Sequence, residues 1–231
     1  MGVPKQTKLS SIPNVSVVIC TLNEEKNIPN VLGNIPSWVN EVVLVDGYSK
    51  DKTVSIAKSL MPSIRVLYQP GLGKDDAMKH GFRNVTGDII VTLDADGSTD
   101  PKQLPEFVSL LLKGYDFSKG SRFLKVDPIM PVHRKIGNTM LTLFTNILFG
   151  TRYTDVCCGY NAFWTHCLKS IDLPDNQFDY EPVLCAKIKK AGLRVIEVQC
   201  QDRGRMSGTS KLRMPTQGLK AALAVLHQRL T

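Results

Sequence analysis

Four short runs of apolar, largely β-branched residues follow one another in the first half of the chain. They are residues 15–21 (VSVVICT), 41–46 (EVVLVD), 64–69 (IRVLYQ) and 88–94 (DIIVTLD). Near-continuous apolar runs of this length are typical of strands that are buried on both faces, as in a parallel sheet. The pattern therefore predicts four strands of one sheet.

Stretches with helical spacing of apolar residues separate these runs. Asn23, either Ser49 or Asp51, and Gly73 stand where helix N-caps or tight turns are expected. An alternation of strand and helix favours an open α/β sheet with right-handed crossovers. The predicted helices of this half cover residues 24–34, 51–60, 73–83 and 101–113.

The second half has a looser pattern. A polar N-terminal arm over residues 1–13 and no separating linker predict one domain over 14–231, with halves 14–120 and 121–231. The elements expected in the second half are a strand at 115–123, a Pro-rich mobile loop at 124–133, a helix at 134–150, a short strand at 159–164, a helix at 180–192, a strand at 193–200 and an amphipathic helix at 216–230.

Composition places the chain among ordinary globular proteins. Of its 231 residues, 42% are hydrophobic and 22% are charged. It has no apolar run of about 18 residues that would span a bilayer, and its start lacks the apolar core of a signal peptide. The six cysteines form no CxxC pair, which favours reduced thiols in a cytoplasmic protein.

Charge is distributed unevenly. Residues 1–120 hold 13 Lys and Arg against 13 Asp and Glu, whereas residues 121–231 hold 16 against 8. Apart from a scattered solvated surface, this asymmetry indicates an anionic partner of the second half: a phosphate-bearing substrate, an anionic membrane surface or nucleic acid. Nucleic acid is disfavoured because basic residues are not interleaved with aromatic ones and no known nucleic-acid-binding motif is present.

Polar tails follow three of the predicted strands. They are TLNEE (21–25), DGYSKD (46–51) and DADGSTD (94–100). Ligands of open α/β sheets bind beyond the carboxyl ends of the strands. Asp94 and Asp96 would point to one face of an extended strand, where hard carboxylate oxygens suit Mg²⁺ or Mn²⁺. A dehydrogenase is disfavoured because TLNEE stands in place of GxGxxG.

Several motifs in fixed order identify a resemblance. VVICTLNEEKNI, VLVDGYSKDKT, GLGKDDAMKHG and GDIIVTLDADGSTDP resemble the inverting family 2 glycosyltransferases of the GT-A fold. The later KGSRF, CGYNAF, FDYEPVL, AGLRVIEV and RGRMSGTSKLR are similar to the branch that contains dolichyl-phosphate mannose synthases and glucose synthases. The resemblance covers about residues 14–215.

The resemblance implies a fold, a reaction and its partners. The fold would be a GT-A (Rossmann-like) open, mostly parallel sheet flanked by helices in a single domain. The reaction would transfer mannose or glucose from a nucleotide sugar, GDP-mannose or UDP-glucose, to a polyprenyl (dolichyl-type) phosphate. Mg²⁺ or Mn²⁺ would assist it by neutralising charge on the departing nucleoside diphosphate.

The resemblance also implies which residues bind the donor. Asp94 would lie near the nucleotide, and Asp96 would hold the cation that bridges the diphosphate; Ser98 stands where the family often has Gln. Asp46 would form a hydrogen bond to the base of the nucleotide. The remaining donor-binding positions are Thr21, Leu22, Asn23 and Glu24 around the base and ribose, and Lys74 beside the nucleotide.

A second group of residues would hold the acceptor and close the site. Arg122 and Arg134 match the acceptor-phosphate positions, with Asn138 where relatives often have Ser. Arg205 and Lys211 match the segment that closes over the diphosphate. Their positive charge suits phosphate recognition.

The acceptor type depends on whether a general base is needed. A phosphate monoester, with a second pKa of about 6, is already ionised at neutral pH. An alcohol would need a carboxylate base, for which Asp155, Asp179 and Glu181 are available, and Glu181 matches a family acid. Asp96, Arg122 and Glu181 are the expected catalytic set. The alternative is a same-fold enzyme that glycosylates a hydroxyl of a soluble glycan or metabolite.

Two apolar stretches, residues 140–149 and 218–226, are too short to span a membrane. Either they lie at a membrane interface beside basic residues or they pack onto the sheet. Besides a wholly cytoplasmic location, the sequence therefore allows a peripheral enzyme at the cytoplasmic face of a membrane, or a soluble partner of a membrane protein.

Overall fold

A seven-stranded sheet forms the centre of the protein. The computed structural model describes residues 12–125, 130–171, 180–209 and 214–231. In space the strands follow the order β3-β2-β1-β4-β6-β5-β7. Their bounds are β1 Val15–Thr21, β2 Glu41–Asp46, β3 Arg65–Tyr68, β4 Ile89–Asp94, β5 Phe117–Ser121, β6 Asn161–Trp164 and β7 Val195–Gln199.

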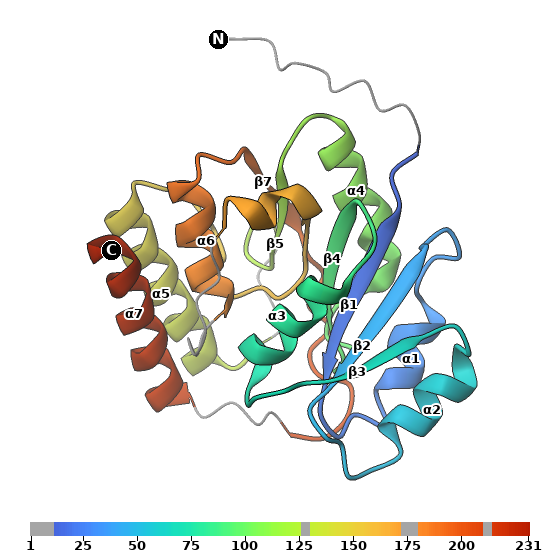
Figure 1. Ribbon diagram of the computed structural model, residues 1–231. Coiled ribbons are helices and arrows are strands. Elements are labelled where there is room, and N and C mark those ends of the chain that lie inside the picture. Colours follow the sequence, from blue (N-terminus) through green and yellow to red (C-terminus); the bar gives the residue numbers. More distant parts are fainter. Residues whose placement is uncertain (1–11, 126–129, 172–179, 210–213) are drawn as a thin grey trace.

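Helices cover both faces of this sheet (Figure 1). Side chains of α1, α2 and α4 share a core with one face, and side chains of α3 and α6 share a core with the other. The helix bounds are α1 Ile28–Gly33, α2 Thr53–Leu60, α3 Lys74–Asn84, α4 Leu104–Leu112, α5 Val132–Phe149, α6 Tyr180–Lys190 and α7 Met214–Leu230, with short 3₁₀ turns at Pro101–Gln103 and Thr165–Lys169.

Six of the seven strands run in one direction. β1 pairs in parallel with β2 and β4, β2 with β3, and β5 with β7, whereas β6 is antiparallel to both β4 and β5. The carboxyl ends of β1, β2, β4 and β5 therefore meet at one edge, and β6 begins at that edge. The predicted fold, an open and mostly parallel sheet flanked by helices, is confirmed.

Burial explains why the apolar runs became strands. In β4, Ile89 to Leu93 are all buried and Asp94 is the first residue with appreciable exposure. Alternate residues point to opposite faces, so Ile89, Val91 and Leu93 pack with one set of helices and Ile90 with the other. A strand covered on both faces is mostly apolar; the one polar residue buried within β4, Thr92, donates its hydroxyl to Gly159 O.

The predicted helix at 24–34 begins four residues late. Residue Asn23 has φ 56°, and its Oδ1 accepts a hydrogen bond from Lys50 N at 2.7 Å, so it joins two loops and does not cap a helix. Glu24 O accepts from Asn27 N and Ile28 N in a separate turn. Likewise α2 begins at Thr53, after both suggested cap positions, although Asp51 Oδ1 still accepts from Thr53 N at 3.0 Å.

The helices α5 and α7 pack against each other and against α6, at the left of Figure 1. A row of large apolar side chains on α5 is more than half exposed: Val132, Ile136, Met140, Leu143 and Ile147. On α7, Leu219, Leu223 and Leu230 are similarly exposed. Within the described ranges, no helix has the length and apolarity needed to cross a bilayer.

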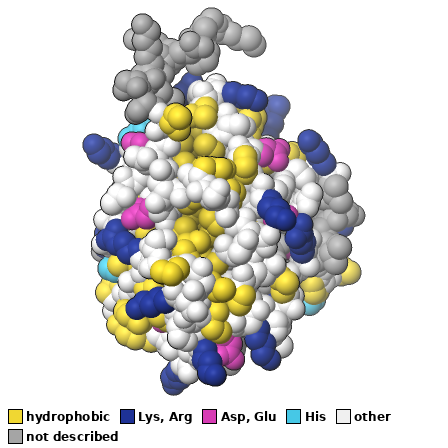
Figure 2. Space-filling view, turned by 90° about the vertical axis from the view of Figure 1, so that its right-hand side faces the viewer, with side chains coloured by type: hydrophobic (Ala, Val, Ile, Leu, Met, Phe, Trp, Pro, Cys, Tyr) yellow, Lys and Arg dark blue, Asp and Glu magenta, His cyan; other side chains and the backbone are white. Residues whose placement is uncertain are grey.

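Figure 2 shows the side of the molecule that carries α1 and α2. Lysine and arginine side chains are scattered around a central band of hydrophobic side chains, and they are not gathered into one stripe on this face. The acidic side chains visible there are few and dispersed. This face therefore lacks the concentrated basic track that typically binds nucleic acid.

Candidate active site

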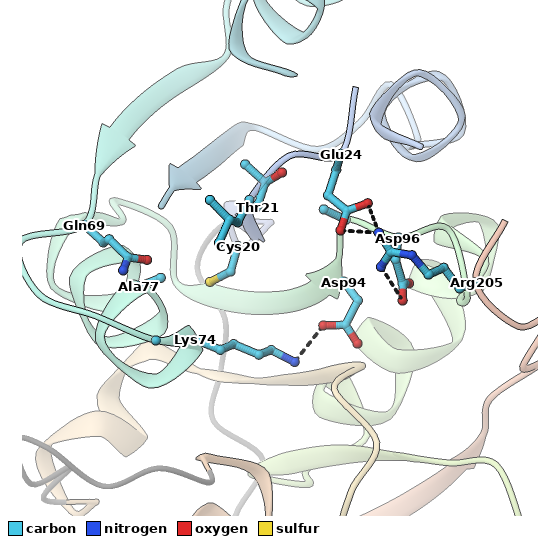
Figure 3. A pocket seen from close by; sticks show the side chains of 12 residues that line it. Cys20, Thr21, Glu24, Gln69, Lys74, Ala77, Asp94, Asp96 and Arg205 are labelled. Atoms are coloured by element: carbon cyan, nitrogen blue, oxygen red, sulfur yellow. Dashed lines mark hydrogen bonds and ion pairs between the residues drawn. The ribbon is translucent and has the colours of Figure 1, made fainter. Parts of the chain in front are cut away.

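A cavity of about 290 Å³ opens at the edge of the sheet where β1 and β4 end (Figure 3). The start of α3 and the loop at 201–209 complete its wall. The residues that line it are Cys20, Thr21, Leu22, Glu24, Gln69, Gly73, Lys74, Ala77, Asp94, Ala95, Asp96 and Arg205. Seven of them are predicted donor-site residues: Thr21, Leu22, Glu24, Lys74, Asp94, Asp96 and Arg205.

Lys74 connects two acidic residues from distant parts of the chain. Its Nζ lies 2.7 Å from Asp94 Oδ1 and 2.6 Å from Glu181 Oε1, which belongs to the first turn of α6. Burial alone would lower the pKa of Lys74, but the two carboxylates raise it well above its usual value. Burial would raise the pKa of Asp94, but Lys74 holds it below its usual value. Both groups are therefore charged at neutral pH.

Arg205 lies between Glu24 and Asp96 (Figure 3). Its Nη2 lies 2.6 Å from both carboxylate oxygens of Glu24, and its Nη1 lies 3.6 Å from Asp96 Oδ2. The other oxygen of Asp96, Oδ1, accepts a hydrogen bond from Ser98 N at 3.0 Å. Burial and the nearby Asp94 carboxylate raise the pKa of Asp96 above its usual value.

The donor set fits a hard divalent cation. Four carboxylates (Glu24, Asp94, Asp96 and Glu181) and two cations (Lys74 and Arg205) leave a net charge of −2 when all are ionised. No group of three or more acidic, His or Cys side chains among the described residues forms a complete metal cage. Mg²⁺ typically binds through one or two carboxylates and completes its shell with phosphates and water, and the two neighbouring carboxylates Asp94 and Asp96 fit that requirement.

Gly159 is a site residue to which the sequence assigned no role. A Cβ at this position would lie 2.6 Å from Asp94 Oδ2, so the backbone can approach the carboxylate only because the residue is glycine. Thr92 Oγ1 donates to Gly159 O at 2.6 Å and fixes that approach. The signal lay in the CGYNAF motif, but only the antiparallel entry of β6 brings it beside β4.

Two predicted base-binding residues do not line the cavity. Asp46 is buried, and both of its carboxylate oxygens accept hydrogen bonds from Ser49, from the backbone N at 2.9 Å and from the hydroxyl at 2.5 Å. Asn23 donates its backbone N–H to Ser49 Oγ at 2.8 Å. Both residues thus shape the loops beside the cavity. Thr21 does line it, and its Oγ1 is buried without a partner among the described residues.

Arg122, a predicted acceptor residue, is held by Asp155 at the end of β5. Its Nε lies 2.7 Å from Asp155 Oδ2 and its Nη2 lies 3.1 Å from Oδ1, and the Asp155 side chain is fully buried. Burial opposes ionisation, but Arg122 keeps the pKa of Asp155 below its usual value. Arg122 also lowers the pKa of Asp94, after the larger effect of Lys74, which places its charge within reach of the cavity.

Four other predicted residues lie away from the cavity or outside the described ranges: the acceptor residues Arg134 and Asn138, the nucleotide-sugar residue Lys211 and the candidate base Asp179. Arg134 and Asn138 lie in the first turns of α5, are half-buried, and do not line the cavity. Lys211 and Asp179 fall outside the described residues. Cys20 lines the cavity, but burial raises the pKa of its thiol far above the usual value, so it is not an activated nucleophile.

Sequence similarity to known proteins extends over most of the chain. It is 31% identical over 214 residues to an undecaprenyl-phosphate mannosyltransferase of Micrococcus luteus, covering 86% of this chain and 87% of the relative. It is 30% identical over 202 residues to a dolichyl-phosphate hexose transferase of Haloferax volcanii, covering 86% of each. An undecaprenyl-phosphate 4-deoxy-4-formamido-L-arabinose transferase of Pectobacterium carotovorum is 26% identical over 88% of this chain, which spans 64% of that relative's length.

Solved structures share the fold. Glucosyl-3-phosphoglycerate synthase of Mycobacterium tuberculosis, in complex with Mg²⁺ and UDP, superimposes with a TM-score of 0.75 at 21% identity. The superposition covers 94% of this chain and 79% of that one. The same enzyme has been solved with Mn²⁺, UDP-glucose and phosphoglyceric acid, at a TM-score of 0.73.

The family follows from these matches. The sequence profile described as Glycosyl transferase family 2 matches residues 16–168, well over half of the chain. The matched region contains all but the first residue of β1 and all of β2 to β6, and therefore includes Asp94 and Asp96. The chain belongs to glycosyl transferase family 2 and is a glycosyltransferase of the GT-A fold.

Proposed function

We propose that the protein transfers a hexose, mannose or glucose, from a nucleotide sugar to a polyprenyl phosphate with inversion at the anomeric carbon. A phosphate oxygen of the acceptor attacks that carbon and forms the new C–O bond. The bond from the carbon to the donor diphosphate breaks, and its electron pair leaves with the nucleoside diphosphate. No proton has to be removed, because the acceptor phosphate is already an anion.

The observation that carries this proposal is the pairing of the two candidate bases that the structure describes, Asp155 and Glu181. The carboxylate of Asp155 is fully buried and bonded to Arg122, and Glu181 is bonded to Lys74. An alcohol acceptor requires a carboxylate that can take a proton, and both of these are occupied by cations. A phosphate acceptor instead requires the cations, and Arg122 is held in place at the edge where β5 ends.

The residues of the cavity divide the remaining work. Asp96, with Asp94 beside it, would hold Mg²⁺ or Mn²⁺, which neutralises charge on the leaving diphosphate when bound. Lys74 and Arg205 add positive charge on either side of the same carboxylates. Thr21 and Leu22 line the part of the cavity where the nucleoside would bind. Arg122 and Arg134 would orient the acceptor phosphate.

A lipid acceptor is supported by the relatives and by the surface of the molecule. The names of two relatives specify a polyprenyl phosphate, undecaprenyl phosphate in one and dolichyl phosphate in the other. The exposed apolar rows of α5 and α7 suit a peripheral position on the cytoplasmic face of a membrane. The α5 row starts at Val132, beside Arg134, so a membrane contact there would bring the lipid phosphate to the acceptor residues.

The experiment is a product assay with two donors and two acceptors. Protein and Mn²⁺ or Mg²⁺ are mixed with labelled GDP-mannose or UDP-glucose, and with either a polyprenyl phosphate in detergent or 3-phosphoglycerate. The expected result is a lipid-soluble labelled product that disappears with Asp96→Asn. Label found only on the soluble acceptor would instead support the hydroxyl alternative, since the structural neighbours were solved with phosphoglyceric acid.

A further inference from the structure

Arg205 faces the oxygen of Asp96 that makes no hydrogen bond to the backbone. Asp96 Oδ1 is occupied by the N–H of Ser98, whereas Oδ2 faces Arg205 Nη1 at 3.6 Å. Because Oδ1 already accepts a backbone hydrogen bond, a cation bound by Asp96 through Oδ2 would lie beside the positive charge of Arg205. Like charges so close in a partly buried site repel strongly.

The backbone around Arg205 is fixed to the segment that carries Asp96. Arg203 N donates to Ser98 O at 2.9 Å, and Met206 N donates to Asp96 O at 3.2 Å. Met206 also packs closely on this turn, since a Cβ at Gly97 would lie 2.6 Å from its Sδ. The backbone is thus held on both sides of Arg205, so a change of partners would involve its side chain, whose Nε donates to Ser207 O at 2.8 Å.

A diphosphate in the cavity would offer that side chain a stronger acceptor. Arginine binds phosphate oxygens through two parallel hydrogen bonds, which are among the stronger ones in proteins. Departure of Arg205 would not strand Glu24, because Asn27 Nδ2 donates to Glu24 Oε2 at 2.6 Å. Glu24 therefore keeps one hydrogen-bond donor after the exchange.

We propose that Arg205 makes the cation and the nucleoside diphosphate bind interdependently. While Arg205 is paired with Glu24 and Asp96, a divalent cation alone meets a positive charge at its own ligand. The diphosphate withdraws Arg205 and releases Asp96, so that cation and nucleotide enter as a pair. This inference rests on the proposed function and adds an order of binding to it. The coupling must be reciprocal, with each ligand strengthening the other by the same factor.

The test measures binding of Mn²⁺ from the electron paramagnetic resonance signal of the free ion. Titrations are run without nucleotide and with saturating UDP or GDP, on the wild-type chain, Arg205→Gln and Arg205→Lys. Arg203→Gln is the matched control: Arg203 lies in the same loop, but its Nη2 pairs with Asp100 Oδ2 at 2.5 Å. Thermal unfolding confirms that each variant is folded.

The substitution Arg205→Gln is expected to raise the affinity for Mn²⁺ alone and to reduce the effect of nucleotide on that affinity. Arg205→Gln binds Mn²⁺ alone about fivefold more tightly or better, and the strengthening of Mn²⁺ binding by nucleotide shrinks by a similar factor. Arg205→Lys retains weak binding of Mn²⁺ alone, and Arg203→Gln behaves as wild type. A residue that only bound phosphate would leave the affinity for Mn²⁺ alone unchanged.

Two results would overturn the inference. The first leaves the proposed function standing, and the second overturns it as well. If Arg205→Gln binds Mn²⁺ alone no more tightly than the wild type, while the wild type binds Mn²⁺ with nucleotide, Arg205 does not compete and only this inference fails. If the wild-type chain binds Mn²⁺ with neither UDP nor GDP, the donor site itself is wrong and the proposed function fails with it.

Discussion

Asp155 holds Arg122 by two side-chain hydrogen bonds, of 2.7 and 3.1 Å, between a fully buried carboxylate and a guanidinium at the end of β5. The chain contains a matched pair at its surface. Asp116 bonds Arg194 through the same two kinds of nitrogen, Nε and Nη2, at 3.0 Å each, but the Arg194 side chain is 49% exposed. The two pairs separate the effect of burial from that of geometry.

Asp155→Asn is expected to destabilise the protein much more than Asp116→Asn. Removing one partner of a buried pair leaves the other charge uncompensated and costs about 3 kcal/mol. The exposed pair is screened by water, so Asp116→Asn should cost about 1 kcal/mol or less. Urea unfolding at neutral pH measures both free energies. Equal losses in the two variants would contradict the assigned role of burial.

The cost of Asp155→Asn should depend on pH in a defined direction. Although burial opposes ionisation, Arg122 holds the pKa of Asp155 in the folded protein below its unfolded value of about 3.9. The stabilisation is therefore fully present above about pH 5 and is lost as the pH falls through the folded pKa. Urea midpoints between about pH 3 and pH 7 should show wild type and variant converging at the acid end. A constant difference would contradict this linkage.

Gly159→Ala is expected to reduce activity while leaving the fold intact. The added methyl would lie 2.6 Å from Asp94 Oδ2 and would displace that carboxylate. A misplacement of about 1 Å in a catalytic site costs roughly 100-fold in rate. Steady-state kinetics measures the loss. Gly218→Ala in α7 is the control, because a Cβ there meets no atom within 4 Å, and its activity should be unchanged.

Lys74→Met is expected to weaken binding of the nucleotide sugar. The substitution leaves Asp94 and Glu181 without the cation that they share. Hydrogen bonds to charged groups contribute about 1.5–3 kcal/mol, so the KM for the donor should rise about tenfold or more. Kinetics with varied donor and fixed acceptor tests this. Lys58→Met, at an exposed position of α2, should retain the wild-type KM; a similar rise there would point to a general charge effect.

The exposed row on α5 is expected to bind lipid surfaces. Ile136 and Ile147 are 54% and 72% exposed, and replacing both by Gln should reduce sedimentation with anionic phospholipid vesicles about tenfold or more. The control pair is Leu60 and Leu112, 54% and 49% exposed on α2 and α4. If both double variants bind vesicles as the wild type does, the α5 row is not the membrane contact.

The fold was predictable where local pattern and burial agree. The runs that became β1, β2 and β4 match the structure to within a residue, because a strand covered on both faces is mostly apolar along its length. The start of α1 was wrong because Asn23 is bound by the neighbouring loop at Lys50. Propensity near a helix start carries no information about such a partner.

Part of the lining of the cavity was predictable from the sequence, whereas the contacts among its residues were not. Motif positions indicated Lys74, Asp94 and Arg205, all of which line the cavity. Their partners were not visible, because Glu181 lies 107 positions from Lys74 and Glu24 lies 181 from Arg205. Asp155, considered as a base, proved to be the anchor of Arg122. Contacts at such separations arise only from the packing of the whole sheet.

The segment that leads into the antiparallel strand β6 separates two parts of the candidate site by a fixed number of residues. Asp155 fixes the acceptor-side Arg122, and Gly159, four residues later, abuts the donor-side Asp94. In the proposed reaction, the distance between attacking phosphate and departing diphosphate is thus set by one short covalent span at a single sheet edge. Lengthening that span by one residue would move the two halves of the reaction apart while leaving each half chemically complete.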